Sequence, residues 1–146
     1  MRRTYWIIAY LVTMFCVASP AMANDHEHNG KALFIVTSDS QQTRGMAMVL
    51  ANAMSEQGAQ LHFLLCDSAG DLAISDYQSE PLEPRGMRPE GLITPLMEAG
   101  ATVEVCALYL PNSEYDESDL REGVGRAKPP EIARMMADES VRVFEF

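Results

Sequence analysis

Two cysteines stand at the ends of apolar segments, and a thiol is the most reactive group these segments could present. Cys106 closes the β-branched run Ala101–Cys106, and Cys66 closes Gln60–Cys66. In open α/β sheets, ligands and catalytic groups collect beyond the carboxyl ends of strands. A thiol there can face the positive end of a following helix, which favours the reactive thiolate. The alternative is that both cysteines are inert, because buried cysteines commonly serve as small core hydrophobes.

Asn24, Asp25 and His26 form a second arrangement with possible chemistry. If a leader is cleaved after Ala23, His26 becomes the third residue of the processed chain. The free amine, two amides and the imidazole then offer four nitrogens in a square plane, which suits Cu(II) or Ni(II). His28 adds a second imidazole nearby. The alternative interpretation is an incidental polar tail.

The first 23 residues have the features of a secretory signal peptide. Arg2 and Arg3 form a basic start, residues 6–18 are apolar apart from one threonine, and Ala21-Met22-Ala23 is a small-x-small cleavage site. We therefore expect cleavage after Ala23 and export to the periplasm. We expect no stable membrane insertion afterwards, because a spanning helix needs about 20 apolar residues.

The charge balance narrows the choice of partners. The chain carries 21 acidic and 11 basic residues, a formal charge of −10, and loss of the leader arginines would make it more acidic. Nucleic acids and anionic lipids both require clustered Lys and Arg, so neither is expected as a partner. The remaining chain is long enough for one domain, and we assign residues 24–30 to a flexible tail and 31–146 to that domain.

The first half of this domain has the pattern of a strand–helix–strand unit. Lys31–Thr37 is a continuous apolar run, typical of a strand buried on both faces. A helix over Arg44–Gln57, closed by Gly58, is predicted from apolar residues at helical spacing: Met46, Val49, Leu50, Ala53 and Met54. Gln60–Cys66 is the second strand. So short a connection through a helix implies parallel strands.

The second half continues the alternation of helices and strands. After a loop with a short helix near Asp71–Asp76, a helix starts at Pro89 and ends at Gly100, with Pro95 expected to kink it or delay its start. The strand ending at Cys106 follows. A polar connection, Asn112–Lys128, leads to a last helix and strand. Pro129 opens that helix, with Ile132, Met135 and Met136 inward, and Ser140–Phe146 is the strand. These elements predict a three-layer α/β/α sandwich on a mainly parallel sheet of four to five strands.

Two other polar features have structural interpretations. His62 lies within the second strand and is interpreted as a structural histidine with a satisfied hydrogen bond. The acidic stretch 114–119 lacks the spacing of a calcium loop and is interpreted as a helix cap.

Several segments together resemble the DsrE/DsrF-like family. They are Lys31–Thr37, Ala51-Asn-Ala-Met, Gly58-Ala-Gln-Leu, Met97–Cys106, Leu120-Arg-Glu-Gly-Val and the closing Val141–Phe146. The resemblance covers Lys31 to Phe146. It implies a parallel α/β/α fold, assembly as trimers or hexamers, and sulfur relay through a persulfide on the cysteine after this strand. Cys106 is the residue that matches this position, and Cys66 has no counterpart in the resemblance. Tyr109 and the loop carrying Met87 are candidates to shelter a persulfide.

The resemblance therefore predicts an exported sulfur carrier that takes sulfane sulfur from a donor and passes it to an acceptor thiol. The alternative is a non-enzymatic periplasmic binding or accessory module, with or without the N-terminal Cu/Ni site. If the strands ending at Cys66 and Cys106 are sheet neighbours, the two cysteines lie about 5 Å apart and a reversible disulfide becomes a hypothesis.

Overall fold

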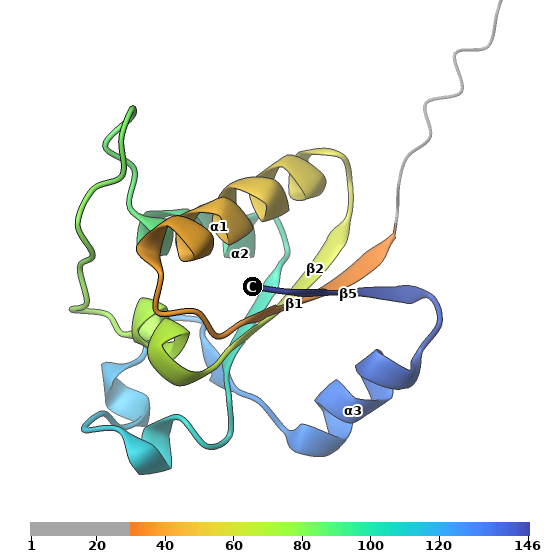
Figure 1. Ribbon diagram of the computed structural model, residues 1–146. Helices are drawn as coiled ribbons and strands as arrows, with labels where there is room; N and C mark the ends of the chain where they lie inside the picture. Colours follow the sequence, from red (N-terminus) through yellow and green to blue (C-terminus); the bar gives the residue numbers. More distant parts are fainter. Residues whose placement is uncertain (1–29) are drawn as a thin grey trace, which may run out of the picture.

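The computed structural model describes residues 30–146, which form a five-stranded parallel sheet between two layers of helices (Figure 1). The strand order is β4-β3-β2-β1-β5, and every neighbouring pair is parallel. Helices α1 and α2 cover one face, and α3 covers the other (Figure 1). The predicted three-layer α/β/α architecture is thus confirmed. The predicted leader and the Asn24–His26 motif lie outside the described residues.

The elements alternate along the chain as the sequence predicts. The strands are β1 (Lys31–Val36), β2 (Gln60–Leu65), β3 (Thr102–Val105), β4 (Gly125–Arg126) and β5 (Val141–Glu145). The α-helices are α1 (Gln41–Glu56), α2 (Ile93–Glu98) and α3 (Pro129–Ala137). Four short 3₁₀ helices lie in the connections: η1 (Asp67–Ala73), η2 (Pro89–Leu92), η3 (Leu110–Asn112) and η4 (Glu117–Asp119).

Helix α1 begins three residues earlier than its apolar pattern predicts, because Ser40 caps it. The Ser40 side chain accepts a hydrogen bond from the Thr43 amide, as an N-cap residue does. Its buried side carries mostly small residues, and a Cβ on Gly45 would lie only 2.4 Å from a methyl carbon of Leu82. Because this side faces the domain, Met46, Val49 and Leu50 of the predicted pattern lie on the outward side of α1 and are exposed.

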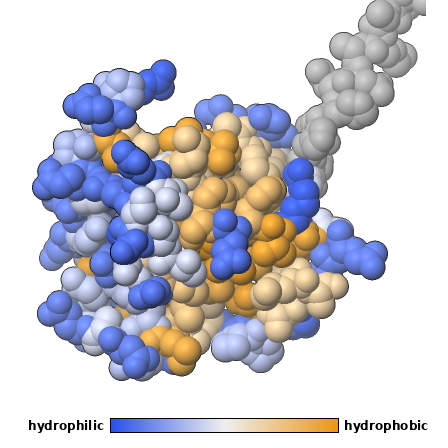
Figure 2. All heavy atoms as spheres, viewed as in Figure 1, coloured by the Kyte–Doolittle hydropathy of each residue, from blue (hydrophilic) through white to orange (hydrophobic). Residues whose placement is uncertain are grey.

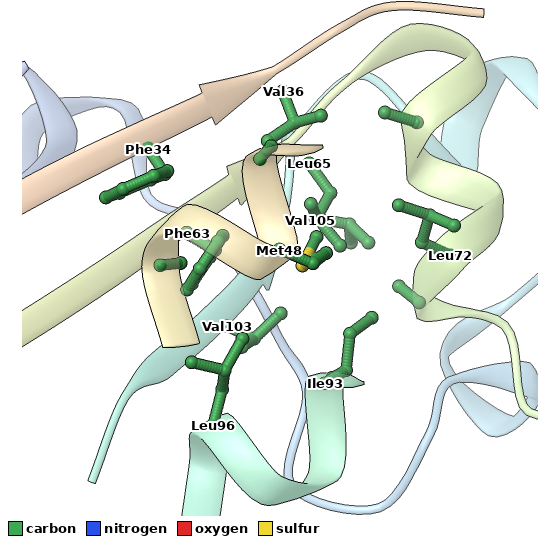
Figure 3. Packing of buried hydrophobic residues seen from close by; sticks show 14 of the residues in the cluster. Phe34, Val36, Met48, Phe63, Leu65, Leu72, Ile93, Leu96, Val103 and Val105 are labelled. Carbon is green, nitrogen blue, oxygen red and sulfur yellow. The ribbon is translucent and has the colours of Figure 1, made fainter. Parts of the chain in front are cut away.

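The main core lies between the sheet and the α1–α2 layer. Alternate side chains of the three central strands point into it and meet Met48, Ile93, Leu96 and Leu72 from the helical layer (Figure 3). Phe34 and Phe63 pack with ring centroids 5.1 Å apart. The opposite face carries a smaller cluster under α3: Leu33, Ala127, Ile132 and Val141. Burial of both sheet faces explains why β1 is apolar at successive positions.

Several details differ from the predicted elements. The 3₁₀ helix η1 begins at Asp67, directly after β2, and replaces the short helix expected near Asp71–Asp76. Strand β4 has two residues at the sheet edge, and so short a strand has no readable alternation. In α3, Ile132 is buried as predicted, but Met136 is 56% exposed because the short helix covers only part of its sheet face.

The proline-rich second helix follows its expected limits. A 3₁₀ turn occupies Pro89–Leu92 and α2 starts at Ile93, so Pro95 falls in the first helical turn, where its missing amide costs nothing. Gly100 has a φ of +96° and ends the segment. Between residues 30 and 146, no helix combines the length and apolarity needed to cross a membrane.

Candidate functional site

The two cysteines meet at the carboxyl edge of the sheet. Strands β2 and β3 are parallel neighbours, with Leu65 in register with Val105. The Cys106 amide donates a 2.8 Å hydrogen bond to the Leu65 carbonyl, and the Cys66 amide donates one of 2.9 Å to Val36. Cys66 and Cys106 thus leave the sheet side by side, as the disulfide hypothesis requires of their strands. Both are half-buried free thiols.

Cys106 lines a pocket of about 500 Å³ beyond this edge. The pocket lies between the segment after β2 and the segment after β3. Its other lining residues are Asp67, Ser68, Asp71, Leu108, Tyr109, Asn112 and Ser113. Cys66 does not line it, so a molecule in the pocket meets Cys106 as its only thiol. The lining includes two carboxylates and no Lys or Arg.

One wall of the pocket is Tyr109, held by η1. Its hydroxyl donates a 2.6 Å hydrogen bond to Asp71 Oδ1. Its ring lies directly against the backbone of Gly70, where a Cβ would come within 2.3 Å of a ring carbon. Burial, and after it the hydrogen bond with Asp71, raises the pKa of Tyr109 above its ordinary value. The hydroxyl therefore stays a proton donor toward Asp71.

The surroundings of Cys66 disfavour its thiolate. Burial, followed by contact with the Cys106 thiol and by the Asp67 charge, raises the pKa of Cys66 to about 12. Cys66 is consequently protonated near neutral pH. Asp67 itself has a φ of +48°, a left-handed conformation that short polar side chains tolerate better than most. This turn directs the chain from β2 into the wall of the pocket.

The sequence suggested that Cys106 could face the positive end of a helix that follows its strand. In the structure, no helix begins directly after Cys106. The chain turns instead, with the Tyr109 amide donating to the Cys106 carbonyl at 2.9 Å, and the next helical turn begins only at Leu110. It is Cys66 that directly precedes a helical segment, η1. The sheet edge and the pocket, and not a helix end, therefore define the surroundings of Cys106.

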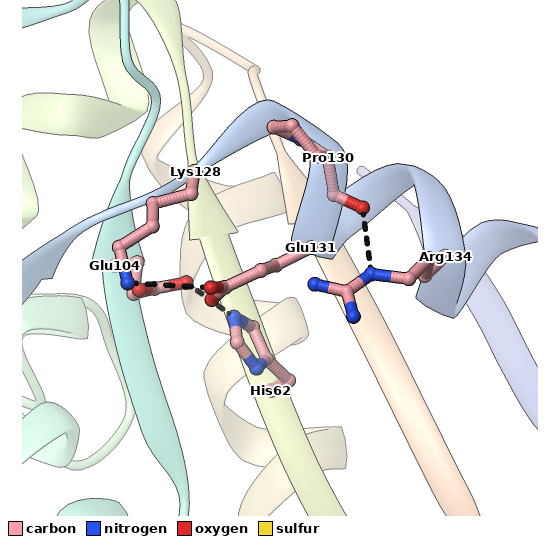
Figure 4. Close-up of polar contacts among 6 residues, drawn as sticks. All are labelled: His62, Glu104, Lys128, Pro130, Glu131 and Arg134. Carbon is pink, nitrogen blue, oxygen red and sulfur yellow. Dashed lines mark hydrogen bonds and ion pairs between the residues drawn. The ribbon is translucent and has the colours of Figure 1, made fainter.

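The remaining candidates divide into those near the pocket and those away from it. Tyr109 lines the pocket, whereas Met87 packs beside Gly45 of α1 and does not line it. His62 pairs with Glu104 at 2.8 Å on the α3 side of the sheet, near Lys128 and Glu131 (Figure 4). The interpretation of His62 as a hydrogen-bonded structural residue is consistent with this pair. The acidic stretch contains a helix cap, because Asp116 caps η4.

Residues 30–146 contain no group of three or more His, Cys, Asp or Glu side chains that could hold a metal ion. The Asn24, Asp25 and His26 motif precedes these residues and stays a prediction. Two further pockets, of about 480 and 670 Å³, lie elsewhere on the domain, and no cysteine lines either of them.

Sequence reasoning missed the acidic residues of the pocket. Asp67 and Asp71 come from the segment directly after β2, which reads as an irregular loop. Their position just past a buried strand was a usable signal, because the segments after neighbouring parallel strands converge at one edge. That Asp71 meets Tyr109, 38 residues away, had no local signal.

Two solved structures share this parallel α/β/α fold. MTH1491, a protein of unknown function from Methanobacterium thermoautotrophicum, aligns with a TM-score of 0.63 and 17% identity, over 80% of this chain and 99% of its own. The YchN protein of E. coli aligns with a TM-score of 0.62 and 19% identity, over 79% of this chain and 99% of its own. No family model matches the sequence, and no curated protein matches it. At these identities the likeness establishes the fold alone.

Proposed function

We propose that this protein is an exported sulfur carrier that holds sulfane sulfur as a persulfide on Cys106. The observation that carries the proposal is the position of Cys106, directly after β3, as the thiol lining a pocket at the carboxyl edge of a DsrE-like sheet. This is where open parallel sheets bind ligands and place reactive groups. Its place after this strand is also the persulfide position in the family that the sequence resembles.

The transfer consists of two exchanges at sulfur. The Cys106 thiolate attacks the outer sulfur of a donor persulfide, its bond to that sulfur forms, and the donor leaves as a thiolate. In the second exchange, an acceptor thiolate attacks the outer sulfur on Cys106 and releases the Cys106 thiolate. No net oxidation occurs, because one sulfur–sulfur bond forms as another breaks. The chemistry therefore requires only an accessible thiolate and room for the reacting partner.

The pocket suits a persulfide because it is partly enclosed and polar. The Tyr109 ring, fixed by Asp71, and the exposed Leu108 flank the thiol. The carboxylates of Asp67 and Asp71 favour a partner that brings neutral or basic groups to the pocket, since opposite charges attract strongly where water is partly excluded. We propose a donor and an acceptor that are proteins presenting a thiol on a neutral or basic surface.

Export to the periplasm belongs to the same proposal. It is supported by the basic start, the apolar segment and the Ala21-Met22-Ala23 cleavage site. Intact-mass analysis of the exported protein should give a chain starting at Asn24. Retention of residues 1–23 in that fraction would contradict export by a cleaved leader.

The decisive experiment is sulfur loading followed by mass spectrometry. After reduction and brief incubation with polysulfide, the protein should gain the mass of one sulfur atom on a peptide containing Cys106. Cys106→Ser should abolish the gain, while the matched variant Cys66→Ser should load as the parent does. Unchanged circular dichroism of both variants separates chemistry from stability.

The competing function gives a different result. If the reduced protein gains no sulfur, and its Cys106 is alkylated no faster than a free cysteine, the carrier proposal is wrong. A non-enzymatic periplasmic binding or accessory module then becomes the better account.

A further inference from the structure

A second thiol, that of Cys66, lies beside the thiol that lines the pocket. Cys66 follows Leu65 of β2 and Cys106 follows Val105 of β3, and Leu65 and Val105 are register partners. Neighbouring strands of a sheet lie about 4.8 Å apart. Disulfides form between Cα atoms about 4.4–6.8 Å apart, so closure of this pair needs little backbone movement. Of these two cysteines, Cys106 lines the pocket and Cys66 does not. An external molecule therefore reaches Cys106, and Cys106 is the neighbour that Cys66 can attack.

We propose that Cys66 is the resolving thiol of this protein: it discharges a persulfide on Cys106 as hydrogen sulfide and closes a Cys66–Cys106 disulfide. The inference rests on the proposed function of Cys106 and adds a limit to the lifetime of the stored sulfur. A persulfide that meets no acceptor ends as free sulfide, and the protein is left oxidised until a thiol reductant restores it.

The step balances without an external oxidant. The Cys66 thiolate attacks the inner sulfur of the persulfide, the one bonded to the Cys106 Cβ. The bond between the two cysteine sulfurs forms, the bond to the outer sulfur breaks, and the outer sulfur leaves as hydrosulfide. It takes up the proton that Cys66 released. The sulfane sulfur is reduced to sulfide, and the two cysteines are oxidised to a disulfide.

The ionisation of Cys66 sets the speed of this step. The groups acting on Cys66 are the Cys106 thiol after β3 and the Asp67 carboxylate in η1, while β1 ends beside it in the apolar Val36. Because these surroundings raise the pKa of Cys66 to about 12, only a small fraction is thiolate near neutral pH. Discharge should therefore be slow at neutral pH, which leaves time for transfer to an acceptor.

The test follows the loaded protein after removal of excess polysulfide. The parent protein should lose its added sulfur as measurable sulfide and end two hydrogens lighter than the reduced form. Cys66→Ser should keep the added sulfur at least about tenfold longer, because an intramolecular thiol has a high effective concentration. Cys66→Ala provides a second variant if the serine destabilises the fold.

The outcomes separate this inference from the proposed function. If neither the parent nor Cys66→Ser takes up sulfur, the carrier function fails. If both load and keep the sulfur equally long, carriage stands and the resolving role is overturned. Migration of the added sulfur to Cys66 without sulfide release would also overturn it.

The geometry can be tested without any persulfide. The reduced protein, treated with the thiol oxidant diamide, should form an intramolecular Cys66–Cys106 disulfide that peptide mapping detects. Failure of the folded parent to form this bond would contradict the inference even if sulfur loading succeeds.

Discussion

The Tyr109 hydroxyl donates a 2.6 Å hydrogen bond to the Asp71 carboxylate, and this contact joins the segment after β3 to the segment after β2. The two segments form the pocket at Cys106, so the bond ties together the two sides of the candidate site. Pocket shape and local stability should therefore change together when this contact is altered.

Removal of the Tyr109 hydroxyl tests this contact. Tyr109→Phe should lower the free energy of unfolding by about 1–2 kcal/mol, because a hydrogen bond to a charged acceptor is lost while the ring remains. Urea denaturation measures the change. Tyr115→Phe is the matched control, since the Tyr115 hydroxyl makes no hydrogen bond within residues 30–146, and it should change stability by less than about 0.5 kcal/mol. Equal effects of the two variants would contradict a special role for the Tyr109–Asp71 bond.

Gly70 tests the packing of the same wall. A methyl group at this position would lie 2.3 Å from the Tyr109 ring, so Gly70→Ala should displace the ring and destabilise the protein by about 1–3 kcal/mol. Gly91→Ala is the control, because a methyl group there meets nothing within 4 Å. Thermal or urea unfolding should find the second variant as stable as the parent or slightly more so. A neutral Gly70→Ala would show that Tyr109 is free to move.

Alkaline stability should report the surroundings of Cys66. Its pKa is about 12 in the folded protein against 9.0 for an unperturbed thiol, so the unfolded chain releases this proton first. The contribution of Cys66 to stability is thus complete below about pH 9 and declines as pH rises toward about 12. Urea unfolding from pH 8 upward should show a steeper loss in the parent than in Cys66→Ala. Parallel curves would place Cys66 in water-like surroundings.

Self-association, expected from the family resemblance, has a candidate surface. Figure 2 shows apolar surface over the part of the domain that contains α1. On α1, the side chains of Met46, Val49 and Leu50 are exposed. An apolar patch of this kind commonly marks an interface, and we expect a second copy of this chain to cover it. Val49→Glu should shift the protein toward monomer in size-exclusion chromatography with light scattering.

Gln78→Glu is the matched control for this surface. It adds the same charge at an exposed polar position outside α1 and should leave the oligomeric state unchanged. A monomeric parent protein at micromolar concentration would contradict self-association altogether.

The N-terminal metal prediction depends on processing. Protein beginning at Asn24 should bind one Cu(II) with a visible absorption band, after its thiols have been blocked. His26→Ala should abolish stoichiometric binding, because the imidazole is the only side-chain ligand of the square-planar set. The uncleaved chain is the control, since His26 is then no longer the third residue. Binding that survives in His26→Ala would assign the metal to other groups.

The sequence by itself was sufficient for the layout of the fold. Continuous apolar runs such as Lys31–Val36 require burial on both sheet faces, and the strand–helix–strand spacing requires parallel pairing. Glycines and prolines marked the element ends for local steric reasons, as at Gly58 and Pro129. It also placed both cysteines after strands and selected Cys106 through the family resemblance.

Only the tertiary structure decided which groups surround these thiols. The order of β2 and β3 brings Cys66 beside Cys106, and the pocket requires Asp71 and Tyr109 from segments far apart in the chain. The tertiary structure likewise decided that α1 buries the side that carries Gly45, Ala47, Met48 and Ala51. Propensity and periodicity act over a few residues, whereas these contacts depend on which strands become neighbours and how closely the layers approach.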